Sequence, residues 1–219
     1  MSSREIPLVN GEMYHIFTKS IAGFKIFNSP SDFRRMLNTL IFYSYEKTPC
    51  KLSLFLKRQD ITNSKPALEF GSQKIVEIIA YCIMPTHIHL ILKQLKDEGI
   101  SKYINLILKS YSKYFNEKHA RKGPLWESRF KNVLVETEEQ FLHLTRYIHL
   151  NPSTAYLVDK PDNWEFSSYK EYLRKTENNA TVCNFLNYLY MDTFSYENFV
   201  NNFIDYERTI SKIKHLILD

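Results

Sequence analysis

The chain has 219 residues, of which 44% are hydrophobic and 15% aromatic, a composition typical of a folded globular protein. This length suits one core of about 150 residues with an appendage. No apolar run approaches the roughly 18 residues that cross a membrane, and no apolar stretch follows the first residues, so we expect a cytoplasmic protein without a membrane partner. The three widely spaced cysteines argue against both a disulfide framework and a cysteine zinc site.

The positive charge is concentrated in one stretch of the chain. The net charge is +5, whereas Ser101 to Lys131 carries eight Lys or Arg against two Glu, a net charge of +6. The residues from Thr176 to the end carry a net charge of −3. We therefore expect the central stretch, and not the C-terminal one, to contact a polyanion such as a nucleic acid.

The first half of the chain predicts a strand, a helix and a hairpin. Met13 to Thr18 alternates as a strand does, and a helix is expected to open at Ser31. Lys51 to Lys57 alternates well enough for a further strand or an irregular crossing segment, and Gln59 to Ser72 is expected to be a long exposed loop. Ile75 to Lys93 predicts a central hairpin, broken at its Pro-Thr pair.

The second half predicts two helices separated by a strand. A helix with an apolar stripe and lysines on its flanks begins at Ser101, and Leu125 to Val135 predicts a strand. Thr137 begins a capping box for another helix, which we expect to run to about Leu150 and to be stopped by Pro152.

The predicted order of elements is β, α, ββ, α, β, α. This order suits an α+β, ferredoxin-like (RRM-like) antiparallel sheet with helices packed on one face. The composition shifts after about Arg174, so we expect one domain over residues 1–175. Residues 176–219 are expected to form a C-terminal helical extension of two or three short helices.

Two histidines on one predicted strand are candidates for a metal site. His87 and His89 project from the same face, with Cβ atoms roughly 6.7 Å apart, so both can reach one divalent ion. The alternative is that they line a polar sheet face. A histidine-triad nucleotide hydrolase would carry a third histidine at position 91, and Ile91 argues against that class.

Tyr147 and Asn151 form a second constellation, on the predicted helix after Thr137. At about 100° per residue they project together from the rim of the apolar face, next to wherever the histidines of the sheet point. They suggest a nucleophile and a third ligand. The alternative is an ordinary boundary tyrosine and a helix-capping asparagine before Pro152.

Several motifs together carry a family resemblance over about 160 residues. They are Tyr14–Phe17, Tyr81–Leu92, Gly123–Lys131, Arg146–Pro152 and Trp164–Tyr169. In order and spacing they resemble the single-strand tyrosine transposases of the insertion-sequence-200 type, and in particular the REP-associated tyrosine transposase branch.

The resemblance implies the HUH endonuclease mechanism with Mg²⁺ or Mn²⁺. His87 and His89 match the metal-ligand pair of the family and Tyr147 matches its nucleophile. Asn151 matches the position of the third ligand, with His143 as the alternative third ligand. Many relatives carry Asn where this chain has Thr86, a change expected to matter little at a turn.

The chemistry fits this assignment. A tyrosine phenol has an unperturbed pKa of about 10, so at pH 7 it needs a nearby cation to act as a nucleophile. Two imidazoles and one amide leave open coordination positions for phosphate oxygens, whereas a closed structural zinc site would need further ligands. The resemblance implies a 5′-phosphotyrosine intermediate on hairpin-flanked, single-stranded DNA, and rejoining to another strand.

The basic stretch is then a candidate DNA-binding surface, its cations tracking phosphates and its aromatic side chains stacking on bases. The candidates are Lys109, Lys113, Lys118, Arg121, Lys122, Trp126, Arg129 and Lys131. The alternatives are a solvated helix flank for the lysines and a core position for Trp126.

Two other functions stay open at this stage. A catalytically inactive nucleic-acid-binding module would keep the same fold, and an HUH replication initiator would share the chemistry but usually carries larger domains. The sequence also leaves monomer and homodimer open, with the monomer favoured.

Overall fold

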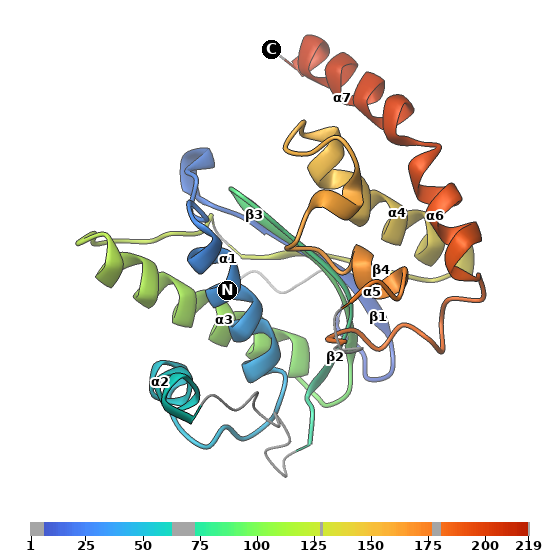
Figure 1. The fold of residues 1–219 in the computed structure, drawn as a ribbon. Helices are drawn as coiled ribbons and strands as arrows, with labels where there is room; N and C mark the ends of the chain where they lie inside the picture. The colour runs from blue at the N-terminus through green and yellow to red at the C-terminus, as the bar shows by residue number, and fades with distance from the viewer. Residues whose placement is uncertain (1–6, 63–72, 128, 177–180, 219) are drawn as a thin grey trace.

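The structure is a computed structural model that describes residues 7–62, 73–127, 129–176 and 181–218. Its centre is a four-stranded antiparallel sheet in the order β2-β3-β1-β4 (Figure 1). The strands are β1 (Met13–Lys19), β2 (Val76–Met84), β3 (His87–Gln94) and β4 (Lys131–Leu134). The ferredoxin-like α+β fold expected from the order of elements is therefore confirmed.

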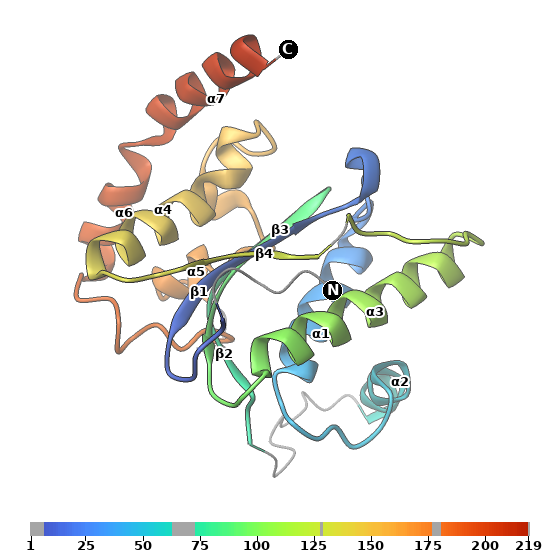
Figure 2. The same ribbon diagram turned by 180° about the vertical axis from the view of Figure 1, so that it is seen from behind.

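Helices α1 (Pro30–Tyr43) and α3 (Gly99–Lys118) cover one face of the sheet (Figures 1 and 2). A capping box formed by Ser29 and Asp32 begins α1. The buried apolar stripe of α3 packs against α1 and against strands β2 and β3, as the helical spacing predicts. The hydroxyl of Tyr103, on α3, donates a hydrogen bond of 2.9 Å to a carbonyl of α1, which ties the two helices together.

Helix α4 (Glu138–Thr154) lies on the opposite face, across β2 and β3 (Figures 1 and 2). The expectation that helices pack on one face therefore holds for α1 and α3 but not for α4. Thr137 caps α4 as predicted, its hydroxyl accepting a 3.1 Å bond from the backbone of Gln140. Pro152 does not stop the helix: it lies in the last turn, where the backbone N–H of Ala155 still donates to the carbonyl of Asn151.

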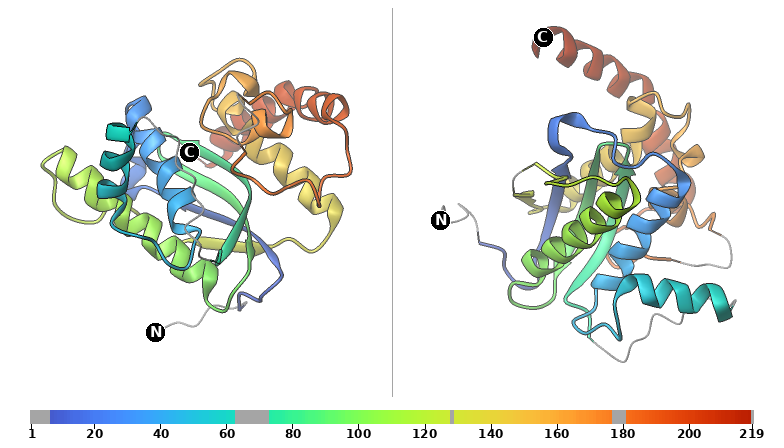
Figure 3. Two further views of the ribbon diagram at one scale, coloured as in Figure 1. Left: turned by 60° about the horizontal axis from the view of Figure 1, so that its bottom comes forward. Right: turned by 90° about the vertical axis from the view of Figure 1, so that its left-hand side faces the viewer.

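The C-terminal helices pack against the outer side of α4. These are α6 (Thr193–Asn201) and α7 (Ile204–Leu218), which lie where two or three short helices were expected from the sequence (Figure 3). The short helix α5 (Tyr169–Tyr172) precedes them. Side chains of the C-terminal segment, among them Tyr196 and Val200, are fully buried and belong to the same hydrophobic core as the sheet.

Two expectations differ from the structure. The segment expected as a strand or crossing is helix α2 (Leu52–Thr62), because Leu52, Phe55 and Leu56 face inward at the i, i+3, i+4 spacing of a helix. Of the loop expected over Gln59 to Ser72, the first four residues belong to α2, and residues 63–72 lie outside the described chain.

The strand expected over Leu125 to Val135 pairs with β1 only over residues 131–134. Before that, the chain touches the sheet at one bridge, between Ser20 and Trp126, because Trp126 turns inward to pack against Phe27 and Tyr111. Among the described residues, no helix is both long and apolar enough to cross a membrane.

Candidate active site

Three histidines meet on the sheet face that α4 covers. His87 and His89 lie two residues apart on β3, and His15 lies on the neighbouring strand β1. Nε2 of His15 is 3.0 Å from Nδ1 of His89, and the two rings are nearly parallel. His89 is 5% exposed and His15 9%, so both imidazoles are withdrawn from water. We call these three residues the histidine cluster.

Helix α4 brings Tyr147 onto the histidine cluster. The centre of the Tyr147 ring lies 5.5 Å from that of His89 and 6.3 Å from that of His15, with the rings close to perpendicular in both pairs. Tyr147 is 42% exposed, so one side of the ring contacts histidines while the other remains open to solvent. The sequence placed these groups on separate elements, and the structure brings them together.

Asn151 follows Tyr147 by one helical turn. Its side-chain nitrogen donates a 2.8 Å hydrogen bond to the backbone carbonyl of Tyr147, which leaves the amide oxygen available as an acceptor or ligand.

His143, the alternative third ligand, turns away from the histidine cluster. Its ring contacts Glu139 at 3.8 Å and Arg146 at 2.9 Å, and it lies against Phe199 of α6. The contacts that His143 makes are thus with α4 and α6, and Asn151 and His143 both remain candidates for the third ligand.

Burial keeps the histidine cluster neutral at neutral pH. It lowers the pKa of His15 and that of His87 to about 4 each, with Lys19 adding to the effect on His87. Burial also lowers the pKa of His89 well below its usual value, and the neighbouring imidazoles add to this. A neutral imidazole is the form that ligates a metal ion.

The same burial makes Tyr147 a weak nucleophile by itself. Withdrawal from water raises the pKa of the phenol, and the nearby Asn151 side chain lowers it by less. The hydroxyl is therefore protonated at neutral pH. Attack by this oxygen needs a positive charge nearby that stabilises the phenolate or the reacting phosphate.

The donor set fits a catalytic divalent metal ion better than a closed structural site. Nδ1 of His87 is 2.9 Å from the hydroxyl of Thr86, and Nδ1 of His89 faces His15, so both ligand candidates have Nε2 left. Across the described part of the chain, no group of three or more His, Cys, Asp or Glu side chains could hold a metal ion. Two imidazoles and an amide oxygen would leave coordination positions open for substrate.

A basic groove adjoins the histidine cluster. It is a hollow of about 190 Å³ lined by Phe17, Thr18, Lys19, Glu127, Arg129 and Lys131. The Phe17 ring, which forms part of its lining, stacks on His15, and its centre lies 5.9 Å from that of His89. The ammonium nitrogen of Lys131 lies 5.9 Å from the centre of the same ring.

Sequence reasoning missed His15, Phe17 and Lys19 as site residues. They occupy alternate positions of β1 and therefore share one face, a signal present in the sequence. Whether they lie beside the histidines of β3 depends on the register between β1 and β3, which the sequence does not show. In the structure Phe17 is paired with His89.

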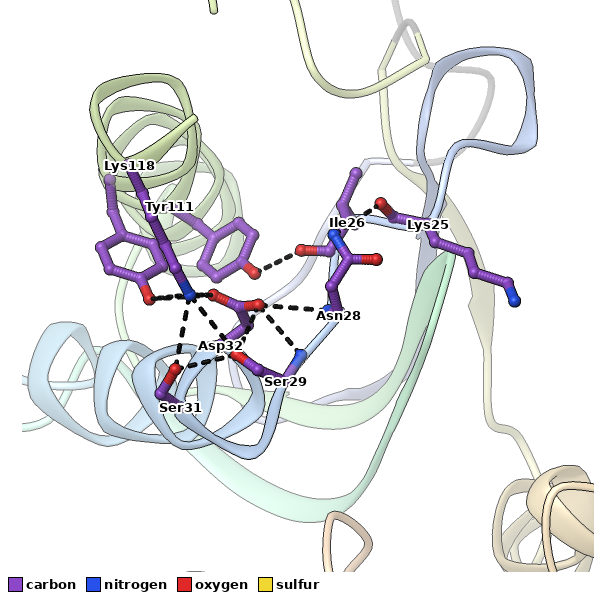
Figure 4. Close-up of polar contacts among 9 residues, drawn as sticks. Lys25, Ile26, Asn28, Ser29, Ser31, Asp32, Tyr111 and Lys118 are labelled. Atoms are coloured by element: carbon purple, nitrogen blue, oxygen red, sulfur yellow. Dashed lines mark hydrogen bonds and ion pairs between the residues drawn. The ribbon is translucent and has the colours of Figure 1, made fainter. Parts of the chain in front are cut away.

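Three of the predicted DNA-binding residues have hydrogen-bond or ion-pair partners within the protein. Lys118 lies 2.6 Å from the buried carboxylate of Asp32 and reaches Ser29 and Ser31 as well (Figure 4). Arg121 donates to the carbonyls of Gly123 and Pro124 and so holds the turn after α3. Trp126 is 8% exposed and its indole N–H donates to a carbonyl of α3.

The other predicted DNA-binding residues lie at the surface. They are Lys109, Lys113, Lys122, Arg129 and Lys131. Lys113 has Glu117 one turn away at 3.6 Å, while Arg129 and Lys131 line the basic groove. The predicted residues at the surface thus lie both on α3 and in the segment that leads into β4, and only the latter line the basic groove.

The residues on either side of Tyr147 are fixed by the C-terminal helices. The guanidinium of Arg146 is packed against the rings of Phe199 and Phe203. The fully buried ring of His149 bridges the hydroxyls of Tyr196 and Ser168 at 2.8 Å each. Helix α4 is therefore held from both sides, by the sheet and by α6, and Tyr147 lies on the edge between them.

Comparison with known proteins places these residues in a family context. Residues 58–151, which include both β3 histidines, Tyr147 and Asn151, match the family model described as "Transposase IS200 like". A Haemophilus influenzae protein named "Putative REP-associated tyrosine transposase" is 24% identical over an alignment of 103 residues that covers 42% of this chain. That alignment spans 58% of the relative's own length.

A solved structure of a REP-associated tyrosine transposase bound to a REP hairpin has the same fold. It aligns with 87% of this chain and 99% of its own, with a TM-score of 0.51 and 17% sequence identity.

Proposed function

We propose that this chain, which matches the IS200-like transposase family model over residues 58–151, is a metal-dependent single-stranded DNA endonuclease and strand transferase. The observation that carries the proposal is the contact of the Tyr147 ring with His89 and His15. This contact places a partly exposed tyrosine, a possible nucleophile, beside neutral imidazoles that can ligate a metal ion.

Tyr147 is the nucleophile in this proposal. Its oxygen forms a bond to phosphorus while the bond from phosphorus to the 3′ oxygen breaks, giving a 5′-phosphotyrosine. The phenol loses one proton and the released 3′ oxygen gains one. Because the phosphotyrosine keeps a phosphodiester bond, a 3′-hydroxyl from another strand can reverse the step without a nucleotide cofactor.

His87, His89 and Asn151 would hold the ion, Mg²⁺ or Mn²⁺. The ion supplies Lewis-acid polarisation of the scissile phosphodiester when it is bound. The protein's own contribution is orientation: β3 fixes both imidazoles, and α4 presents the phenol and the amide on one edge. The basic groove offers Lys19, Arg129 and Lys131 to the phosphates of a strand entering the site.

A hairpin-flanked DNA is the proposed substrate. The support is the likeness to a REP-associated tyrosine transposase whose structure was solved bound to a REP hairpin. The alignment with the Haemophilus influenzae relative, which covers 42% of this chain, supports a place in the same branch of the family.

The test uses labelled single-stranded hairpin DNA from the flanks of the gene, Mn²⁺ or Mg²⁺, and a denaturing gel. The wild-type protein should give a covalent band that disappears with EDTA and in Tyr147→Phe, while binding of the DNA persists. Tyr190→Phe, at a tyrosine that is 81% exposed, is the matched control and should cleave normally. Cleavage by Tyr147→Phe would remove Tyr147 from the role, and binding without any cleavage would favour a non-catalytic nucleic-acid-binding module.

A further inference from the structure

His15 contacts His89, a proposed metal ligand, but the proposed function assigns His15 no role. It is diagonal to His89 across the β1–β3 pair, on the same face, because Phe17 is the direct partner of His89. The two ring nitrogens that face each other are Nε2 of His15 and Nδ1 of His89, 3.0 Å apart. The rings are inclined by 17° and both are buried, so side-chain freedom is small and the contact is well defined.

A hydrogen bond between two ring nitrogens needs one that carries a proton and one that offers a lone pair. If His89 donates through Nδ1, its Nε2 keeps a lone pair and can ligate a metal ion. If His15 donates instead, a neutral His89 must carry its proton on Nε2, and neither of its nitrogens is then available. The direction of this single bond therefore decides whether His89 can serve as a ligand.

The neighbouring ligand candidate shows the same arrangement. Nδ1 of His87 is 2.9 Å from the hydroxyl of Thr86, an oxygen that can accept a hydrogen bond. Both histidines of β3 thus have Nδ1 engaged by a protein group and Nε2 left over. Metal-ligating histidines almost always donate their second ring N–H to such an acceptor, which fixes the ring and its tautomer.

We propose that His15 is a positioning residue that accepts the Nδ1–H of His89 and so holds His89 in the tautomer with Nε2 unprotonated. The inference rests on the proposed function, because it assigns His15 a purpose in the same metal site. His15 acts through His89 and does not itself contact the ion or the DNA. In the same way, the hydroxyl of Thr86 accepts the Nδ1–H of His87 and leaves its Nε2 unprotonated.

Two substitutions separate the hydrogen bond from the packing of the ring. His15→Phe keeps an aromatic ring against Phe17 and removes the acceptor. His15→Gln places an amide oxygen near the position of Nε2 and so retains an acceptor. Circular dichroism and the unfolding midpoint of each variant show whether the fold is intact.

The first measurement is the tautomer of His89 in the metal-free protein, from the chemical shifts of its two ring nitrogens by ¹⁵N NMR. We expect the proton on Nδ1 in the wild type and in His15→Gln, and a shift toward Nε2 in His15→Phe. A wild-type His89 protonated on Nε2 would overturn the proposal. Because no metal is present, this result does not depend on whether the protein cleaves DNA.

The second measurement is Mn²⁺ affinity, from the electron paramagnetic resonance signal of the free ion. His15→Phe should weaken binding about 10- to 100-fold, and His15→Gln should restore most of it. Wild-type affinity in His15→Phe would overturn the proposal. Equal loss in both variants with an unchanged His89 tautomer would also overturn it, because His15 would then be a direct ligand. Lack of Mn²⁺ binding by the wild type would instead contradict the proposed function, and the tautomer measurement would still decide the hydrogen bond.

Discussion

The guanidinium carbon of Arg146 lies 3.5 Å from the centre of the Phe203 ring. The centre of the Phe199 ring, on α6, lies 4.4 Å from the same carbon, and Nη1 of Arg146 is buried with no hydrogen-bond partner among the described residues. The two rings therefore compensate electrostatically for water that the guanidinium has lost. This contact joins the C-terminal helices to the residue before the proposed nucleophile.

Phe203→Ala should therefore lower the free energy of unfolding by about 1–2 kcal/mol, because it removes a cation–π contact and uncovers a buried cation. Urea denaturation measures the change. Phe194→Ala is the matched control on α6: its ring is 72% exposed, so a change below about 0.5 kcal/mol is expected. Equal losses in the two variants would show that the contact with Arg146 adds nothing.

Asp32→Asn should destabilise the protein by about 3 kcal/mol. The carboxylate is fully buried and accepts bonds from Lys118, Tyr114 and the cap of α1 (Figure 4). Removing the negative charge leaves the Lys118 ammonium without its partner, and that ammonium is only partly solvated. Glu117→Gln, in an exposed pair with Lys113, is the control and should cost less than about 0.5 kcal/mol.

The same carboxylate should contribute to acid unfolding. Burial raises the pKa of Asp32, but the hydrogen bonds from Lys118, Ser29, Tyr114 and the Asn28 backbone together outweigh it, so the folded-state pKa lies below the usual value. The unfolded chain then binds this proton more readily, so the stabilisation is complete above about pH 4 and is lost as pH falls through the folded-state pKa. Unfolding free energies measured from pH 6 to pH 2 should fall less steeply in Asp32→Asn than in the wild type. Parallel slopes would exclude Asp32 as a source of acid sensitivity.

Lys19→Ala and Lys131→Ala should weaken binding of single-stranded DNA if the basic groove receives its phosphates. Each lost phosphate contact should also reduce the slope of log affinity against log salt by about 0.7. Fluorescence anisotropy at several salt concentrations measures both quantities. Lys57→Ala, at an exposed lysine of α2, should leave both unchanged. Equal effects at all three lysines would indicate general electrostatic attraction in place of a defined groove.

Trp126→Ala should lower stability by about 3–5 kcal/mol, because the indole packs with Phe27 and Tyr111 in the core. Trp126→Phe keeps much of that packing and should bind DNA as the wild type does. A folded Trp126→Phe protein with clearly reduced DNA affinity would restore the interpretation of Trp126 as a base-stacking residue.

Local pattern was enough to predict the elements that form the site. Alternation placed His87 and His89 on one face of a strand, and helical spacing placed Tyr147 beside Asn151, because both periods are set by backbone geometry alone. The local pattern failed at Leu52 to Thr62, because a short apolar run is compatible with either a strand or a helix. Packing of Leu52 and Phe55 decides for the helix.

What the sequence by itself determined is which chemical groups this protein offers and how neighbours along each element are spaced. Only the tertiary structure decided which groups meet. The β1–β3 register brings His15 to His89, and the crossing of α4 brings Tyr147 to both. The chain after α3 buries Trp126, and the packing of α1 against α3 pairs Lys118 with Asp32. The physical reason is range: backbone periodicity acts over a few residues, whereas burial and charge pairing join residues far apart in the chain and are set only when the elements pack.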